Sequence, residues 1–290
     1  MTHSDAQSNP PLRPGGETST STFLGNQLHY AQLLSESLGG PLPELDQSTL
    51  DGTSSILDLG CGVGAWALIV ASRYDHMHIT GIDGGASAIN DAQTLAWAHR
   101  KQENLTFAQM NPAGPLAFDD NTFDLVNANN ISWKVAHRKN WPQILAEAYR
   151  VARPGGIIRL HELEVAISNS PANQHLYGSF LQALVKAGLS YSVDGRTFGF
   201  TPTLQYLLRE AGCSDARLSV ACVDVSSATE LHEGWRDNLI VLDQFVTPFV
   251  VSTGVASLEE RKAWFEQMKD EVDASWYRGA LLFVTVWGRK

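Results

Sequence analysis

Two acidic residues and a cluster of glycines are the part of this sequence best suited to chemistry. Asp58 lies at the end of a short apolar run and is followed at once by Gly60 and Gly62, and Asp83 ends the next apolar run. Glycines after a buried strand let the backbone approach a ligand closely, because they carry no Cβ. Open α/β sheets bind ligands at this end of their strands. The pattern therefore predicts a ligand site with two carboxylates beside it.

The glycine spacing alone leaves two cofactors open. Gly60, Gly62 and Ala65 fit the dinucleotide fingerprint, with an acidic residue about 20 positions later, so NAD(P) and an oxidoreductase are one interpretation. S-adenosylmethionine is the other, and we favour it. Asp58 would sit badly beside a pyrophosphate but well beside the ammonium of a methionine moiety. The neighbouring sequence also lacks a basic residue to balance phosphates, and the motifs further along are not those of dehydrogenases.

Alternating strand and helix patterns must position these residues. Short apolar runs near 56–59, 78–82, 105–107, 123–128 and 156–160 alternate with helical patterns at 65–72, 87–99 and 141–151. This alternation is typical of βαβ units and a parallel sheet buried on both faces. Further along, we expect helices at 172–187, 201–211, 231–245 and 258–272, and two late strands at 217–225 and 280–287. A helix is also expected at 23–38, followed by a loop or short irregular segment at 41–53.

Four motifs in order resemble those of class I S-adenosylmethionine-dependent methyltransferases, in the group of ubiquinone/menaquinone and natural-product methyltransferases. They are Leu57-Asp-Leu-Gly-Cys-Gly-Val-Gly64, Gly81-Ile-Asp83, Phe118-Asp-Asp-Asn-Thr-Phe-Asp-Leu-Val126 and Tyr149-Arg-Val-Ala-Arg-Pro-Gly-Gly156. The resemblance covers roughly 54–162 well and the remainder loosely. It implies a Rossmann-like α/β fold with a seven-stranded, mostly parallel sheet, an antiparallel last strand and helical lid insertions. It also implies transfer of a methyl group and release of S-adenosylhomocysteine.

The resemblance also implies a set of cofactor contacts. Asp83 would hold the ribose hydroxyls, and Met110 and Asn111 replace the acidic residue that the family usually has near the adenine. The amide oxygen of Asn111 can accept from the adenine amine. The predicted cofactor-binding residues are Asp58, Gly60, Cys61, Gly62, Asp83, Gly84, Met110, Asn111 and Asn129.

The acceptor half of the site is the harder part to predict. His161 follows the fifth predicted strand and is the candidate catalytic base, because histidine titrates near neutral pH. Aromatic residues in the insertions suggest a bulky, apolar or aromatic metabolite, methylated on O, N or C. The predicted substrate-binding residues are Phe23, Tyr30, Trp133, His161, Tyr177 and Phe200. A repurposed protein of this fold that promotes cyclisation remains an alternative.

Composition limits the partners. The formal net charge is −10 with no Lys/Arg-rich run, which argues against a nucleic-acid substrate. We expect no membrane partner and a cytoplasmic location, because no apolar run is long enough to span a bilayer and the three cysteines are widely separated. No metal is expected, since no ligand spacing is present; a homo-oligomer is compatible with the sequence.

The expected organisation has three parts. Residues 1–21 are rich in Ser, Thr, Pro and Gly and are predicted to be a disordered tail. Residues 22–53 would form an N-terminal helical lid. Residues 54–290 would form the methyltransferase domain, with helical insertions at about 168–200 and 228–275.

Overall fold

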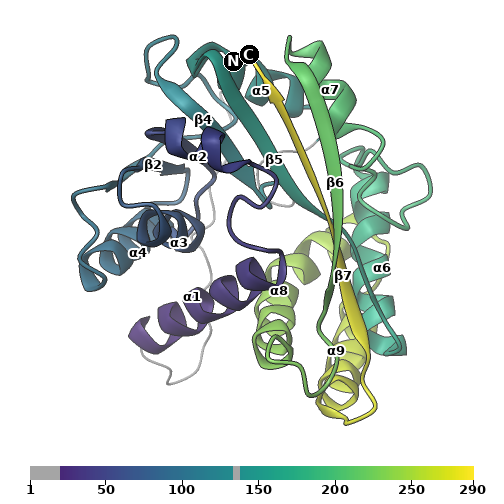
Figure 1. The fold of residues 1–290 in the computed structure, drawn as a ribbon. Coiled ribbons are helices and arrows are strands. Elements are labelled where there is room, and N and C mark those ends of the chain that lie inside the picture. The colour runs from purple at the N-terminus through teal and green to yellow at the C-terminus, as the bar shows by residue number, and fades with distance from the viewer. Residues whose placement is uncertain (1–19, 133–137) are drawn as a thin grey trace, which may run out of the picture.

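A seven-stranded sheet is the centre of this computed structural model, which describes residues 20–132 and 138–290 (Figure 1). The strands run in the order β3-β2-β1-β4-β5-β7-β6. All neighbours are parallel except that β7 lies antiparallel between β5 and β6. This confirms the predicted mostly parallel sheet with an antiparallel last strand. The strands are β1 (Ser55–Leu59), β2 (His78–Asp83), β3 (Leu105–Gln109), β4 (Phe123–Asn129), β5 (Ala152–Ser168), β6 (Ser214–Asp224) and β7 (Gly279–Arg289).

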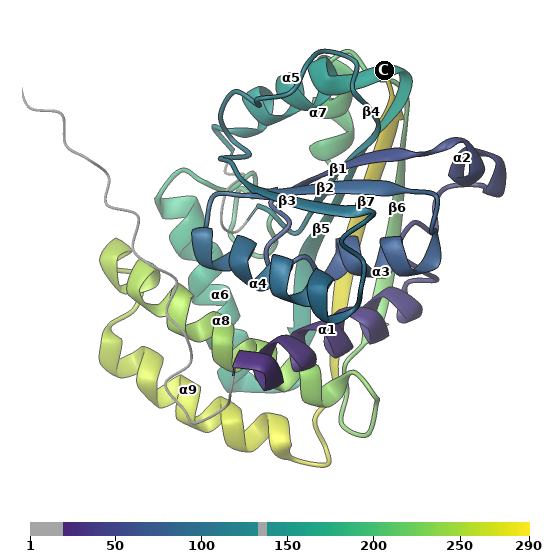
Figure 2. The ribbon, with the colours of Figure 1, turned by 90° about the vertical axis from the view of Figure 1, so that its left-hand side faces the viewer.

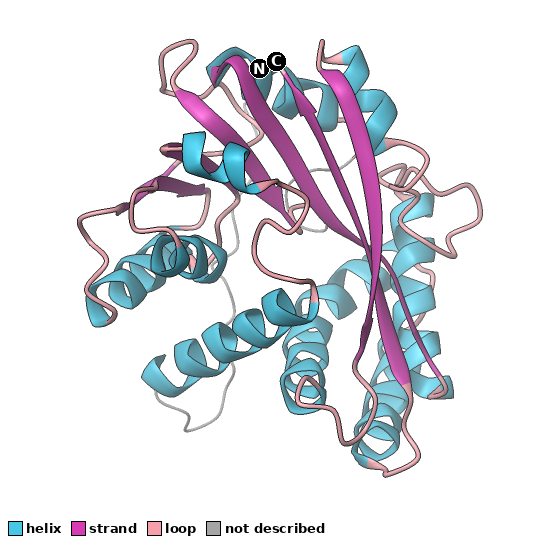
Figure 3. Cartoon of the chain, viewed as in Figure 1, coloured by secondary structure: helices cyan, strands magenta, loops and turns pink. Residues whose placement is uncertain are grey.

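Helices cover both faces of the sheet. Figure 2 shows α5 and α7 on one face, with α3 and α4 on the other and α1 on the same side as α3. Beyond the carboxyl ends of the core strands, α6, α8 and α9 gather along the long β5 and β7 (Figure 3). The helices are α1 (Thr20–Ser37), α2 (Gln47–Gly52), α3 (Ala65–Arg73), α4 (Ala86–Ala98), α5 (Trp141–Val151), α6 (Pro171–Lys186), α7 (Leu204–Glu210), α8 (His232–Thr253) and α9 (Leu258–Asp273).

Several predicted boundaries were wrong. The fifth strand extends well past Leu160, because residues up to Ser168 continue to pair with β7. The helix expected from Thr201 begins only at Leu204, since Thr201 gives its backbone and hydroxyl hydrogen bonds to the Glu164 carboxylate instead. The stretch expected to be a loop or short irregular segment at 41–53 contains α2, whose first turn is capped by Asp46. Residues Thr20 and Ser21 of the predicted tail already belong to α1, and the rest of that tail lies outside the described residues.

Candidate active site

The loop between β1 and α3 requires glycine for steric reasons. Gly60, Gly62 and Gly64 all have positive φ angles, of 68°, 56° and 77°. A Cβ at Gly60 would lie 2.6 Å from the Ile131 side chain, and one at Gly64 would lie 2.7 Å from the Phe107 ring. A Cβ at Gly62 would meet no atom within 4 Å among the described residues. The backbone of Gly62 therefore faces open space at the carboxyl edge of the sheet, where a ligand can approach it.

Asp83 joins this loop to the next one. One carboxylate oxygen accepts a hydrogen bond from the Gly62 amide at 3.1 Å, and the other accepts from the Gly85 amide at 2.8 Å. Gly85 is the N-cap residue of α4, so the Asp83 carboxylate also holds the start of this helix in place. The neighbouring Gly84 is exposed and has open space around it.

The stretch predicted to lie near the adenine follows β3 beside Asp83. The Met110 amide donates to the Asp83 carbonyl at 3.0 Å, and the Met110 side chain is half-buried. The Asn111 amide oxygen already accepts from the Ala113 amide at 3.0 Å, which closes a local turn. One lone pair of that oxygen therefore remains for a ligand. The structure brings Met110 and Asn111 to the same edge as Asp83.

Asp58 is buried at the head of a chain of polar side chains that crosses three strands. Asn127 on β4 donates to Asp58 at 2.7 Å and accepts from Arg159 on β5 at 2.8 Å. Arg159 in turn pairs with Glu44, from the segment between α1 and α2. Burial raises the pKa of Asp58 to about 7, and the Asn127 hydrogen bond and the Arg159 charge oppose that rise. The sequence around the glycine loop lacks a cation, yet the fold supplies one from β5.

His161 lies opposite Asn129 in the β4–β5 register, at the carboxyl edge of the sheet. Its Nδ1 is 2.8 Å from the Thr285 hydroxyl, and its ring stacks on Phe283 with centroids 4.9 Å apart. Burial, assisted by the Arg159 charge, holds the pKa of His161 well below its ordinary value. The imidazole is therefore neutral around pH 7 and can accept a proton or a hydrogen bond.

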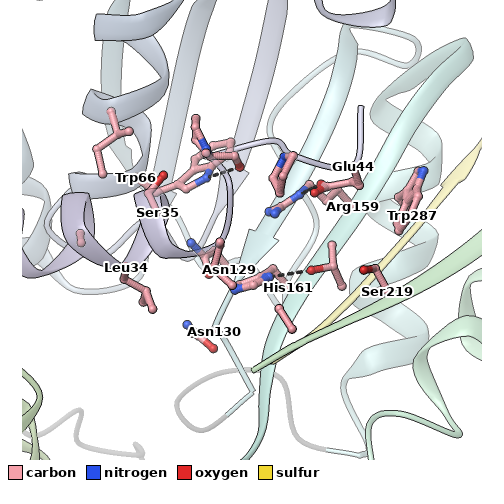
Figure 4. A pocket seen from close by; sticks show the side chains of 18 residues that line it. Leu34, Ser35, Glu44, Trp66, Asn129, Asn130, Arg159, His161, Ser219 and Trp287 are labelled. Carbon is pink, nitrogen blue, oxygen red and sulfur yellow. Dashed lines mark hydrogen bonds and ion pairs between the residues drawn. The ribbon is translucent and has the colours of Figure 1, made fainter. Parts of the chain in front are cut away.

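A pocket of about 260 Å³ opens beside these residues (Figure 4). Its roof comes from α1 and the segment that follows it, one wall comes from α3, and its floor is the sheet. Figure 4 shows Glu44, Arg159, Asn129 and His161 around the same space, with Trp66 and Trp287 on opposite sides of it. The pocket thus combines an apolar lining with the polar side chains of Glu44, Arg159, Asn129 and His161.

The end of β4 is held firmly next to this pocket. The Glu162 carboxylate accepts from the backbone amides of Ile131 and Ser132, at 3.0 and 3.4 Å. Asn130 adds two hydrogen bonds. Its backbone amide donates to the His161 carbonyl, and its side-chain oxygen accepts from the Leu163 backbone amide. Burial raises the pKa of Glu162 to about 8. These contacts fix Asn129 and Asn130 against β5.

Most of the predicted substrate residues lie elsewhere. Phe200 is buried and stacks on Phe198 at 5.2 Å, while Tyr177 packs edge-on against the same ring. Tyr30 packs against Gly234 of α8. Among the predicted substrate residues with described side chains, only His161 lines the pocket. Trp133 and the side chain of Phe23 lie outside the described residues.

Sequence reasoning missed the pocket's main polar residues. Glu44 sits in a Pro-rich segment without periodicity, and Thr285 and Ser219 lie on late strands whose order in the sheet is not visible locally. Arg159 did carry a signal, because it is a charged residue inside the apolar run Ile157–Leu160. A charge inside a buried strand requires a partner.

Two further findings bear on the chemistry. Within residues 20–132 and 138–290, no three or more His, Cys, Asp or Glu side chains are grouped so as to hold a metal ion. In the same part of the chain, none of the helices has the length and apolar character needed to cross a membrane.

Comparison with known proteins finds relatives among methyltransferases. Residues 56–156 match a family described as "Methyltransferase domain". A ubiquinone/menaquinone biosynthesis C-methyltransferase from Roseobacter denitrificans is 28% identical over 192 residues, which cover 62% of this chain and 73% of that protein. These matches support a class I S-adenosylmethionine-dependent methyltransferase.

Other relatives of this methyltransferase differ in what they methylate. Norajmaline N-methyltransferase from Rauvolfia serpentina is 30% identical over 139 residues, covering 48% of this chain and 45% of that protein. A sterol 24-C-methyltransferase from Gibberella zeae is 32% identical over 107 residues, but only 27% of its length is covered. An O-methyltransferase family protein from Burkholderia thailandensis shares the fold, with a TM-score of 0.51, 15% identity, and coverage of 70% of this chain and 55% of the other.

Proposed function

We propose that this methyltransferase moves the methyl group of S-adenosylmethionine to an O, N or C atom of a small metabolite. The observation that carries the proposal is the Asp83 carboxylate bridging Gly62 and Gly85, beside two glycines, Gly62 and Gly84, that face open space. The relatives named for C- and N-methylation support the class of reaction. A natural-product acceptor and a cytoplasmic location belong to the same proposal.

The residues at this edge fit the cofactor. Asp83 keeps lone pairs for ribose hydroxyls, because each of its oxygens accepts one backbone amide and has a second lone pair. Buried Asp58 supplies a carboxylate toward the methionine ammonium. Met110 and Asn111 stand beside Asp83 for the adenine. When bound, the cofactor supplies an electrophilic methyl group on a sulfonium.

The chain's own residues then hold and enclose the acceptor. The neutral His161 imidazole, with Nδ1 at Thr285, presents its other nitrogen as a proton acceptor. We propose His161 as the catalytic base, and residues 22–53, which supply the roof of the pocket, as the lid. Enclosure excludes water and aligns the reactants, which provides much of the rate in such transfers.

The loop at 187–203 is a weaker candidate for a moving lid. The Glu164 carboxylate accepts from the amides of Gly199 and Thr201, at 2.9 and 2.6 Å, and so ties this loop to β5. The Phe198 and Phe200 rings are buried in the core. Phe198 and Phe200 are therefore residues of the hydrophobic core.

Calorimetry and product mass test the proposal together. We expect S-adenosylmethionine and S-adenosylhomocysteine to bind, and NAD and NADP not to bind. Tight NAD(P) binding without binding of S-adenosylhomocysteine would establish the oxidoreductase alternative. With candidate acceptors, a gain of one methyl group supports transfer, whereas an isomerised product of unchanged mass supports cyclisation.

A further inference from the structure

Two buried acceptor atoms of residues that line the pocket lack hydrogen-bond partners among the described residues. Glu44 Oε2 and Asn129 Oδ1 are both shielded from solvent, and neither accepts a hydrogen bond from any described residue. The Glu44 side chain is only 4% exposed. An unpaired buried acceptor costs roughly 1–3 kcal/mol, so native proteins pair nearly all of them. Both atoms belong to residues that line the same pocket, which makes a bound ligand the natural partner.

The charges in the pocket indicate which ligand. Arg159 is committed on two sides, since it pairs with Glu44 and donates to Asn127. A carboxylate or phosphate on the ligand would be repelled by the Glu44 carboxylate, and the Arg159 charge is already compensated by that same carboxylate. The Glu44–Arg159 pair is neutral in sum, so the pocket does not require a charged ligand. What each of the two unpaired atoms requires is an O–H or N–H donor.

The rest of the lining is apolar and suits a compact ring. Leu34, Leu38, Ile69 and the rings of Trp66 and Trp287 border the same space. A volume of about 260 Å³ equals roughly nine water molecules, enough for one or two rings. Aromatic and aliphatic walls with a few placed polar atoms are typical of small-molecule sites.

We propose that this pocket is the acceptor site, and that it selects an uncharged aromatic or alicyclic molecule whose hydroxyl or amine donates a hydrogen bond to Glu44 Oε2. A second donor on the ligand, or the second hydrogen of an amine, would pair with Asn129 Oδ1. The proposal rests on the proposed methyl transfer. For a hydroxyl, the O–C bond forms as the S–C bond breaks, the electron pair of that bond stays on sulfur, and the hydroxyl proton passes to a pocket acceptor and then to water. Carboxylic acids and phosphates are excluded as the group held at Glu44.

Three probes of similar shape test this selection: phenol, anisole and benzoate. Their binding is measured by ligand-detected NMR on the full chain, with and without S-adenosylhomocysteine. We expect phenol to bind at least tenfold more tightly than anisole, which lacks the donor, and than benzoate, which adds a negative charge. A site built around buried polar groups rejects analogues that leave them unpaired. Equal binding of phenol and anisole, or tighter binding of benzoate, would overturn the proposal.

Variants separate the pocket from the cofactor site. In Glu44→Gln one oxygen can still face Arg159 while an amide NH₂ replaces Oε2, so the preference for phenol over anisole should disappear. Glu36→Gln makes the same change at an exposed position of α1 and should leave the preference intact. Ala221→Leu fills the pocket from β6 without touching Glu44, and should weaken phenol binding at least tenfold even if Glu44→Gln misfolds.

Calorimetry with S-adenosylhomocysteine distinguishes the two hypotheses. Its binding should be unchanged in Ala221→Leu. If the wild-type protein binds phenol selectively but not S-adenosylhomocysteine, the pocket exists and the proposed methyl transfer fails. If it binds S-adenosylhomocysteine but shows no preference among the probes, the cofactor assignment stands and the pocket proposal fails.

Discussion

Asp58 on β1 and Arg159 on β5 interact through the amide of Asn127, which donates to one and accepts from the other. The two ionisable groups lie two strands apart in the sheet, and β4 between them supplies the connection. Because Arg159 also pairs with Glu44, the predicted cofactor edge and the pocket share one buried polar chain. Changes of charge at either end should therefore be detectable at the other.

Cofactor binding should become tighter as the pH rises through the range below 7. The folded pKa of Asp58 is about 7 against an ordinary 3.8, so the carboxyl carries a proton between these values. If the cofactor ammonium favours the carboxylate, binding releases that proton, and affinity rises up to tenfold per pH unit in this window. Calorimetry with S-adenosylhomocysteine at pH 6, in buffers of different ionisation enthalpy, should detect the release, and Asp58→Asn should abolish it.

Folding stability should show the opposite slope in the same window. The native state holds the Asp58 proton between about pH 4 and 7, whereas the unfolded chain has lost it. The contribution of Asp58 to the free energy of unfolding therefore decreases as the pH rises from 4 to 7. The contribution of Asp58 is obtained by comparing denaturant unfolding of the wild type and Asp58→Asn across this range. Parallel curves for the two proteins would contradict the raised pKa.

Asp83→Ala should weaken S-adenosylhomocysteine binding by about 1–3 kcal/mol, the range for leaving hydrogen-bonding groups unpaired. The amides of Gly62 and Gly85 lose their acceptor at the same time, so both loops should also loosen. Asp83→Asn keeps the shape and one acceptor oxygen, and should lose less. Calorimetry gives the affinities. Unchanged affinity in the alanine variant would count against the assignment of this edge.

His161→Asn should lower kcat by about 10²–10⁴, the usual contribution of a positioned general base. Burial depresses the pKa of His161, so protonation of this imidazole should not reduce kcat near pH 6.5. The pH profiles of kcat for the wild type and the variant should therefore be parallel in that range. Thr285→Val removes only the partner of Nδ1, and should retain more activity than His161→Asn. A variant within threefold of wild type would leave His161 a structural residue.

Gly234→Ala should destabilise the contact between α8 and α1. An added Cβ would lie 2.5 Å from the Tyr30 ring, and overpacking of this kind costs about 1–3 kcal/mol. Gly178→Ala on α6 is the matched control, since nothing lies within 4 Å of its added Cβ among the described residues. The control should be neutral or more stable by about 0.4–1 kcal/mol. Thermal unfolding of the two variants gives the comparison.

Methyl transfer should not require a divalent metal. Dialysis against EDTA should leave the rate of S-adenosylhomocysteine formation unchanged, because this reaction needs no Lewis acid when the acceptor is aligned. The assay follows turnover with an accepted substrate before and after chelation. Activity that is lost in EDTA and restored by Mg²⁺ would show that this expectation is wrong.

The parts of the fold that could be predicted depend on residues that are close together in the sequence. The glycines after β1 and Asp83 after β2 act on their own neighbours, so a short window of sequence reveals them. The pocket could not be predicted in this way, because its residues are far apart in the sequence. Glu44 and Arg159 meet across 115 positions of sequence, and Thr285 reaches His161 only because β7 inserts between β5 and β6. Phe200, predicted from its residue type to bind the substrate, stacks on Phe198 in the core, a contact that its neighbouring sequence does not reveal.

The origin of the pocket walls has a consequence for how this protein can diverge. Of the 18 residues that line the pocket, only Trp66, Ile69, Asn129 and Asn130 fall within the stretch 56–156 that matches the family. The remaining lining comes from α1, the segment after it and the last three strands, outside that shared stretch. Mutations there can retune what is recognised while the glycine loop stays constant. Homologues with the same loop can thus acquire different acceptors in evolution by altering only their terminal segments.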